Sequence, residues 1–304
     1  MAKLNIPDEL KADMPQTFWS KILFATPVVM TVVATALAGL ASSEMTRAQY
    51  SRSLAAQQQS KAGDQWGFFQ AKRLRGAMQR STLDLLQSTT EVHPFDAKTV
   101  ENSGVALDSP VGRQMLTALQ QGSLPDVAAT EIDPKVKETL EAIASSKPEQ
   151  EIAPLIAQVQ DKAIDDALRA GQDRAQAFDS ATKPVNQTID HTEEQLARQP
   201  AGAQATRDFI AARLRYTALR YDAEARLNQS IAYIYEMQVR KSNFDAERHH
   251  RRSQRFFYGM LGAQMAVIIS TFSLAARKRS LLWSLAAAAG AGAVGFALYV
   301  YMFV

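Results

Sequence analysis

The sequence predicts an all-α integral membrane protein with three transmembrane helices and a long antiparallel helical stalk that carries a helical tip. Three apolar runs contain no charged residue, and each is long enough for a membrane-crossing helix of about 20 residues. A heptad pattern of apolar and small residues precedes the second run, as in helices that pack along their length. No stretch alternates apolar and polar residues in the manner of a half-buried strand.

The apolar runs are residues 22–43, 256–276 and 281–304. They could instead be core helices of a soluble protein, and the first could be a cleaved signal peptide. Their length without a charge argues against core helices, while the long first run with its thin basic flank argues against cleavage. No ionisable side chain lies within a run, which argues against a proton relay or an ion-coupled transporter.

The rest of the chain divides at helix start and stop signals. Residues 1–21 form a polar tail, residues 44–89 an outgoing stalk helix, residues 90–200 a helical tip, and residues 201–255 a return stalk helix. Within the tip, a Ser-Pro pair at 109–110 and an Asp-Pro pair at 133–134 each open a short helix. A third pair, Lys147 and Pro148, opens one longer helix that continues past a kink at Pro184.

Small and seam residues are predicted to pack the helices against one another. Glycines four residues apart and small-xxx-small pairs permit close approach of helix backbones, and the return helix repeats its seam at spacings of 4 and 3. The predicted helix-packing residues are Gly63, Gly67, Ala218, Tyr221, Ala225, Asn228, Ala232, Tyr235, Gly292 and Gly295. For the glycines at 63 and 67, a tolerated weak point in the helix is the alternative.

The stalk helices are expected to meet through matched small residues. The two faces predicted to touch are Ala55, Ala62 and Gly63 on the outgoing helix and Ala225, Asn228 and Ala232 on the return helix. A buried amide at Asn228 could fix the register of a coiled coil. It could equally form a local hydrogen bond with Gln58 or Gln65.

Basic residues border the second and third apolar runs. Those predicted to meet lipid headgroups are Arg248, Arg251, Arg252, Arg255, Arg277, Lys278 and Arg279. The two sides of the membrane carry nearly equal numbers of Lys and Arg, so the tight basic loop at 277–279 decides the orientation. This places the large helical region on the extracytoplasmic side of the membrane, in a multi-pass protein.

No motif in the sequence indicates an enzyme, and no cofactor is expected. The chain has no cysteine, no glycine-rich phosphate loop and no framed nucleophile. His249 and His250 share a helix region with Asp245, but the adjacent arginines oppose a metal cation and the ligands are too few. Basic and acidic residues alternate along the return helix, so nucleic-acid binding is not predicted.

Two stretches resemble a family of uncharacterised bacterial membrane proteins that is catalogued only as a domain of unknown function. The first is Asp64-Gln65-Trp66 followed by Gln70-Ala71-Lys72, after a glutamine-rich helix. The second is Arg248-His249-His250 before the second apolar run, with Arg277-Lys278-Arg279 and Trp283 between the last two runs. The resemblance implies an integral membrane protein with a mainly helical domain, and it implies no activity.

Three functions agree with these features. The first is a non-enzymatic scaffold that associates with further copies of itself. The second is a membrane sensor whose helical tip binds a small ligand and signals through a partner protein. The third is an accessory subunit of a membrane protein. The expected partners are therefore the lipid bilayer and either a homo-oligomer or another membrane protein.

Overall fold

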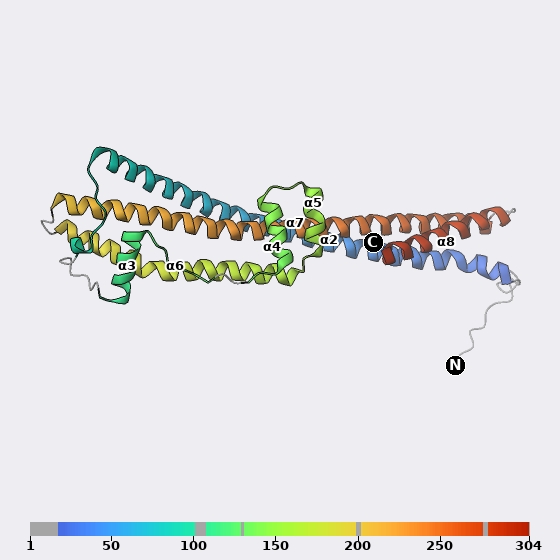
Figure 1. The fold of residues 1–304 in the computed structure, drawn as a ribbon. Helices are drawn as coiled ribbons and strands as arrows, with labels where there is room; N and C mark the ends of the chain where they lie inside the picture. The colour runs from blue at the N-terminus through green and yellow to red at the C-terminus, as the bar shows by residue number, and fades with distance from the viewer. Residues whose placement is uncertain (1–17, 101–107, 129–130, 199–201, 276–278, 304) are drawn as a thin grey trace. The chain divides into compact units, whose positions relative to one another are not determined.

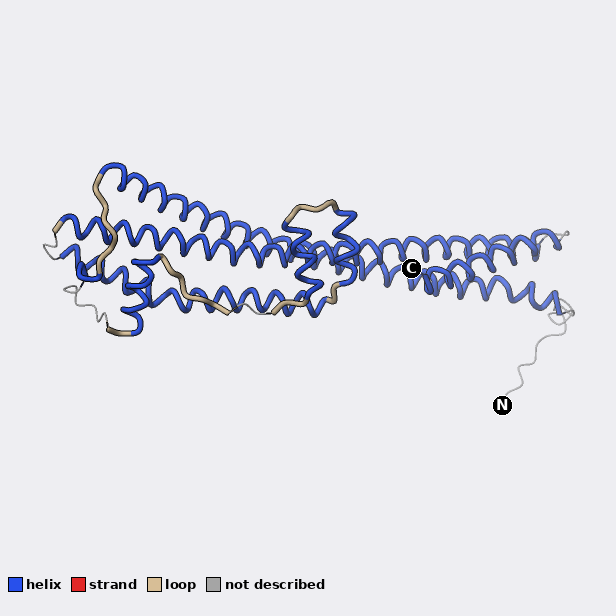
Figure 2. Tube along the Cα trace, viewed as in Figure 1, coloured by secondary structure: helices blue, strands red, loops and turns tan. Residues whose placement is uncertain are grey.

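The structure is a computed structural model that describes residues 18–100, 108–128, 131–198, 202–275 and 279–303 (Figure 1). Every regular element within these residues is a helix (Figure 2), which confirms the all-helical prediction. The chain forms two compact units. We call residues 1–54 and 242–304 the terminal unit and residues 55–241 the central unit.

The helices follow the order of the predicted segments. They are α2 (Phe18–Thr89), the 3-10 helix η1 (Ala97–Val100), α3 (Pro110–Gln121), α4 (Pro134–Ala144), α5 (Glu149–Gln158), α6 (Asp161–Arg198), α7 (Ala203–Ala275) and α8 (Arg279–Phe303). The first apolar run and the outgoing helix are one helix, α2, and the return helix and second run are one helix, α7. Most of the predicted tail at 1–21 lies outside the described residues.

The short helices begin where their sequence signals predict. The Ser109 side chain accepts a hydrogen bond of 3.0 Å from the Gly112 amide, with Pro110 in the first turn of α3. Gly122 ends α3 with φ of 65°, a left-handed conformation that costs glycine little. At α4, the Asp133 carboxylate accepts from the Lys135 amide at 2.8 Å.

The single long helix expected after Pro148 is wrong, because the structure divides it into α5 and α6. Val159 adopts an extended conformation between them and buries its side chain. The Gln160 carbonyl then accepts from the Ala163 amide at 3.0 Å to begin α6. Lys241 on α7 holds the break, since its ammonium group contacts the Val159 carbonyl and lies 3.3 Å from Asp161 Oδ1.

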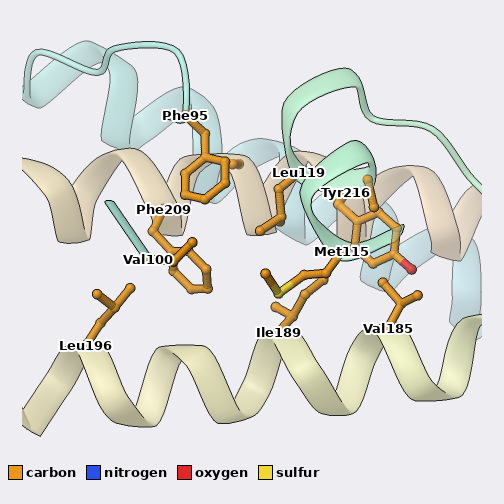
Figure 3. Close-up of a cluster of buried hydrophobic side chains, with 11 residues drawn as sticks. Phe95, Val100, Met115, Leu119, Val185, Ile189, Leu196, Phe209 and Tyr216 are labelled. Atoms are coloured by element: carbon orange, nitrogen blue, oxygen red, sulfur yellow. The ribbon is translucent and has the colours of Figure 1, made fainter. Parts of the chain in front are cut away.

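The central unit has two main cores, and α6 and α7 contribute to both. Figure 3 shows the first, where Met115 and Leu119 from α3 lie between α6 and α7. Tyr216 is fully buried there, and its hydroxyl has no hydrogen-bond partner among the described residues. Burial raises the pKa of the Tyr216 phenol, and the nearby Arg220 charge acts in the opposite direction. The second core joins α4, α5, α6 and α7.

Within the central unit, three polar side-chain pairs connect α2 with α7. The pairs are Trp66–Glu236, Lys72–Glu224 and Arg80–Asp222, so the residue number of the α7 partner decreases as that of the α2 partner increases. The Trp66 indole N–H donates to Glu236 Oε1 at 2.7 Å. The ring also meets Phe69 and Tyr233 edge-on, at centroid distances of 5.4 and 5.2 Å.

The terminal unit buries several small residues together with Leu37 and Phe256, and it exposes many other large apolar residues. Ala34 on α2, Ala263 on α7 and Ala293 on α8 form one buried cluster. A Cβ added to Gly290 of α8 would lie 2.7 Å from Met30 Sδ, so α8 approaches α2 closely at this glycine. In the described part of the chain, one helix, α2, is long and apolar enough over residues 25–89 to cross a membrane.

Candidate functional site

The predicted seam of the return helix lies at the packed face of α7. Ala218, Ala225, Ala232 and Tyr235 are buried, and Ala62 of α2 clusters with Ile231 and Tyr235. Tyr221 is half-buried. It lies beneath two cations, with Lys72 Nζ 5.4 Å and Arg220 Cζ 4.6 Å from the ring centroid.

Asn228 uses its amide within its own helix. Its Nδ2 group donates to the Glu224 carbonyl at 3.0 Å. The Glu224 carboxylate in turn receives the Lys72 ammonium from α2 and Arg220 from one turn earlier on α7. Charge pairing around Glu224 is therefore one of the polar contacts that the structure places beside the seam.

The glycines of α2 differ in how closely other atoms surround them. An added Cβ would meet nothing within 4 Å at Gly63 or Gly67, whereas at Gly76 it would lie 3.2 Å from Asp222 Oδ1 and 3.4 Å from the Ala218 carbonyl oxygen. Gly63 was predicted to face α7, and it does not. Adjacent helix residues point about 100° apart, and here that rotation leaves Gly63 exposed beside the buried Ala62.

In α8, the packed small residues differ from the predicted ones. Ala286, Gly290 and Ala293 face inward at spacings of 4 and 3. An added Cβ at Gly292 or Gly295 would meet nothing within 4 Å. Both glycines are therefore open to contacts from outside this chain.

A polar cluster lies at the end of the apolar part of the terminal unit. His249 Nδ1 on α7 lies 2.6 Å from Glu44 Oε2 on α2, and both side chains are mostly buried. Arg47 contacts the other Glu44 oxygen at 3.4 Å from a more exposed position. One turn along α7, the Ser253 hydroxyl donates to the Ala41 carbonyl at 2.7 Å. These bonds tie α2 to α7 by polar contacts at this level.

A pocket of about 550 Å³ lies next to this cluster. His250, Ser253 and Gln254 form its polar wall, while Phe257 and Tyr258 contribute to the apolar wall. His250 Nε2 lies 3.1 Å from Gln254 Nε2, and His250 Nδ1 is buried without a hydrogen-bond partner in the described ranges. The pocket therefore combines an apolar wall with a wall of polar side chains.

The predicted headgroup-binding residues surround α7 at this level. Arg248 and Arg251 are exposed, Arg252 and Arg255 are half-buried, and Arg251 pairs with Glu247 at 3.4 Å. Arg277 and Lys278 lie outside the described residues, as does the side chain of Arg279. The described arginines thus follow several faces of α7 and form a collar.

The central unit contains a groove that the sequence did not indicate. It consists of two pockets, of about 420 and 350 Å³, that share Arg174, Leu227 and Ser230. Helix α4 and residues 124–127 form its side walls over α6 and α7. No periodic signal could have located it, because its lining comes from segments far apart in the sequence.

Glu44 was also missed by sequence reasoning. It is the first acidic residue after the first apolar run, and this position was the available signal. Its partner His249 had been considered only as a metal ligand or part of the basic collar. Among the residues whose placement is described, no group of three His, Asp or Glu side chains could hold a metal ion.

Residues 23–106 match a family model described as "Domain of unknown function (DUF4337)". The match covers the apolar part of α2, the rest of that helix and the segment after it, and it contains the Asp64-Gln65-Trp66 and Gln70-Ala71-Lys72 stretches. It confirms the resemblance to a family without an assigned function. No curated protein and no solved structure matches the chain.

Proposed function

We propose that the chain, whose residues 23–106 are similar to this family, is a non-enzymatic helical scaffold anchored in a membrane. Three helices over residues 22–43, 256–276 and 281–304 would cross a bacterial inner membrane. The central unit would lie on the extracytoplasmic side, with α2 and α7 forming an antiparallel stalk. The scaffold would assemble from several copies of the chain.

The observation that carries the membrane proposal is the outer surface of the terminal unit. Large apolar side chains on all three of its helices are exposed, and they include Val28, Val32, Leu40, Phe257, Met265, Ile268, Phe272, Leu285 and Leu298. In water, an apolar surface of this extent would be unfavourable. Alanine and glycine line part of the interior, as in membrane bundles where small residues allow close packing.

An exposed stripe on α2 supports self-association. Phe68, Leu74, Met78 and Leu85 each leave more than half of their surface exposed, and Leu74, Met78 and Leu85 follow spacings of 4 and 7. This stripe lies opposite the α2 face that carries Gly76 and Leu83 into the central unit. Copies in one membrane share an orientation, so two such stripes would meet in parallel, as in a coiled coil.

Mass photometry of the full chain in mild detergent tests the scaffold. We expect an oligomer at micromolar concentration, and we expect the paired change Leu74→Gln and Met78→Gln to shift it toward monomer. Gln79→Ala, on the same helix turn but off the stripe, is the matched control. A strictly monomeric parent protein would refute self-association.

Membrane crossing and orientation need a separate test, and the absence of cysteine makes it direct. Spin labels on Val32→Cys and Ile268→Cys should be accessible to oxygen and protected from a water-soluble relaxant. A cysteine in place of Ser180, exposed on α6, should react with an impermeant maleimide added outside intact cells. Labelling only after lysis would reverse the proposed orientation.

A membrane sensor is the second candidate function. The groove between α4, α6 and α7 favours it, because a scaffold does not need a ligand-sized pocket. Such a sensor would pass its signal to a partner protein.

A further inference from the structure

The groove of the central unit has two different halves. The first half, of about 350 Å³, is bounded mainly by apolar side chains from three helices, among them Leu140, Leu227 and Ile234. The second half, of about 420 Å³, is lined by Leu219, Arg226 and residues 124–127. Along α7 the groove extends from Leu219 to Ile234, which is about 22 Å at 1.5 Å per residue.

Unpaired positive charge lies in the second half and at the junction. Arg226 lines the second half and Arg174 lines both, and neither guanidinium has an ion pair in the described part of the chain. Asp126 is the one carboxylate that lines this half. At the apolar half, Lys137 and Glu141 are both exposed at the rim and offset each other.

We propose that this groove binds a single-chain amphiphile with an anionic head. The head, a carboxylate or a phosphate, would accept hydrogen bonds from Arg174 and Arg226, whose forked donors match both groups. The hydrocarbon tail would lie in the apolar half, against Leu140, Leu227 and Ile234. The inference deepens the second candidate function and is independent of the scaffold, since binding and self-association are measured separately.

The size of the groove favours a ligand with one hydrocarbon tail over a ligand with two. Each half has the volume of a small-molecule site, and the groove is long in one direction along α7. A phospholipid with two tails needs a second apolar channel beside the first. A neutral apolar ligand would not use the two guanidinium groups, and an acidic peptide would not use the apolar half.

Photo-crosslinking identifies both the ligand class and the site. The full chain in phosphatidylcholine nanodiscs is incubated with diazirine-labelled palmitate, irradiated, digested and mapped by mass spectrometry. We expect labelled peptides from α4 and from residues 227–234 of α7. Unlabelled palmitate or hexadecyl phosphate should compete, and the more effective of the two identifies the head as carboxylate or phosphate. Hexadecanol, which has the tail without the charge, should compete poorly.

Two kinds of variant separate the head site from the tail site. Arg174→Gln with Arg226→Gln should reduce labelling about tenfold, because charged hydrogen bonds are lost from exposed side chains that do not support the core. Ala170→Trp should block the apolar half without changing its charge. Arg215→Gln, exposed on α7 outside the groove, is the control and should label like the parent protein.

Three results would overturn the proposal. They are labelling confined to residues 18–54 and 242–303, equal competition by hexadecanol, and unchanged labelling in the double arginine variant. Each can occur whether or not the chain forms oligomers. A failed scaffold and a failed ligand site are therefore distinguishable.

Discussion

Replacing Ala62 by leucine tests the contact between α2 and α7 in the central unit. Ala62 has no exposed surface, and it packs against Ile231 and Tyr235. The larger side chain would have to enter a filled space, and overpacking of this kind costs about 1–3 kcal/mol. We therefore expect Ala62→Leu to lower the free energy of unfolding by that amount.

Thermal unfolding of the full chain in detergent, followed by circular dichroism, measures this loss. A domain of about 150–250 residues loses about 2–4 °C in Tm for each kcal/mol. Gly63→Ala is the matched control one residue away, since its added methyl group meets nothing within 4 Å. Alanine is favoured over glycine in a helix by about 1 kcal/mol, so this control should raise the Tm.

A second change at the contacting residue makes the test specific. Ile231→Ala alone should cost about 2–5 kcal/mol by leaving a cavity. Combined with Ala62→Leu it should cost less than the sum, because leucine occupies space that isoleucine vacates. Additivity within about 0.3–0.5 kcal/mol, or an Ala62→Leu protein that melts like the parent, would refute the packing of these side chains.

Three further predictions concern single polar or backbone features. Tyr216→Phe removes a buried hydroxyl that has no hydrogen-bond partner among the described residues, and it should stabilise the protein by about 1 kcal/mol. Burial raises the folded-state pKa of Tyr216 above its ordinary value of 10.0, so the free energy of unfolding of the parent protein should fall as the pH rises above 10. Urea unfolding at several pH values should show a weaker pH dependence of this free energy for the variant. His249→Ala should lower the free energy of unfolding by about 1–3 kcal/mol, because it removes the mostly buried partner of Glu44. Arg47→Ala, which removes the exposed partner of Glu44, should lower it by about 0–1 kcal/mol. Differential scanning fluorimetry compares the two variants, and equal losses would contradict this assignment. Gly122→Ala should cost about 1–2 kcal/mol in chemical unfolding, since φ is 65° and the new Cβ would meet Leu219 Cδ1 at 3.0 Å; an unchanged midpoint would be inconsistent with this turn.

Local signals predicted the helix boundaries well. Ser109 and Asp133 cap α3 and α4 as expected, and Gly122 ends α3, because each acts on backbone groups a few residues away. The break at Val159 could not be predicted in this way. Its contacts come from residues far along the chain, such as Lys241, which reaches the Val159 carbonyl only in the folded protein.

The candidate sites depended more on tertiary structure. Burial of Ala225 and Ala232 follows from a heptad pattern, which specifies the packed face of a helix. The choice among glycines does not follow from spacing, because Gly63, Gly67 and Gly76 all suit close approach and only the partner helix selects Gly76. Arg174 and Arg226 had no distinguishing signal, since exposed arginines on polar helix faces are common.

The surroundings of Trp66 give the central unit its own optical reporter. It is the one tryptophan between residues 55 and 241, and the other two, Trp19 and Trp283, can be replaced by phenylalanine. Its indole is fixed by a carboxylate on α7 and two perpendicular rings. Any separation of α2 from α7 would free the indole from Glu236 and Tyr233 together. Emission wavelength and anisotropy would then change at once, so the opening of this helix pair can be timed in the purified protein in lipid bilayers without an added dye.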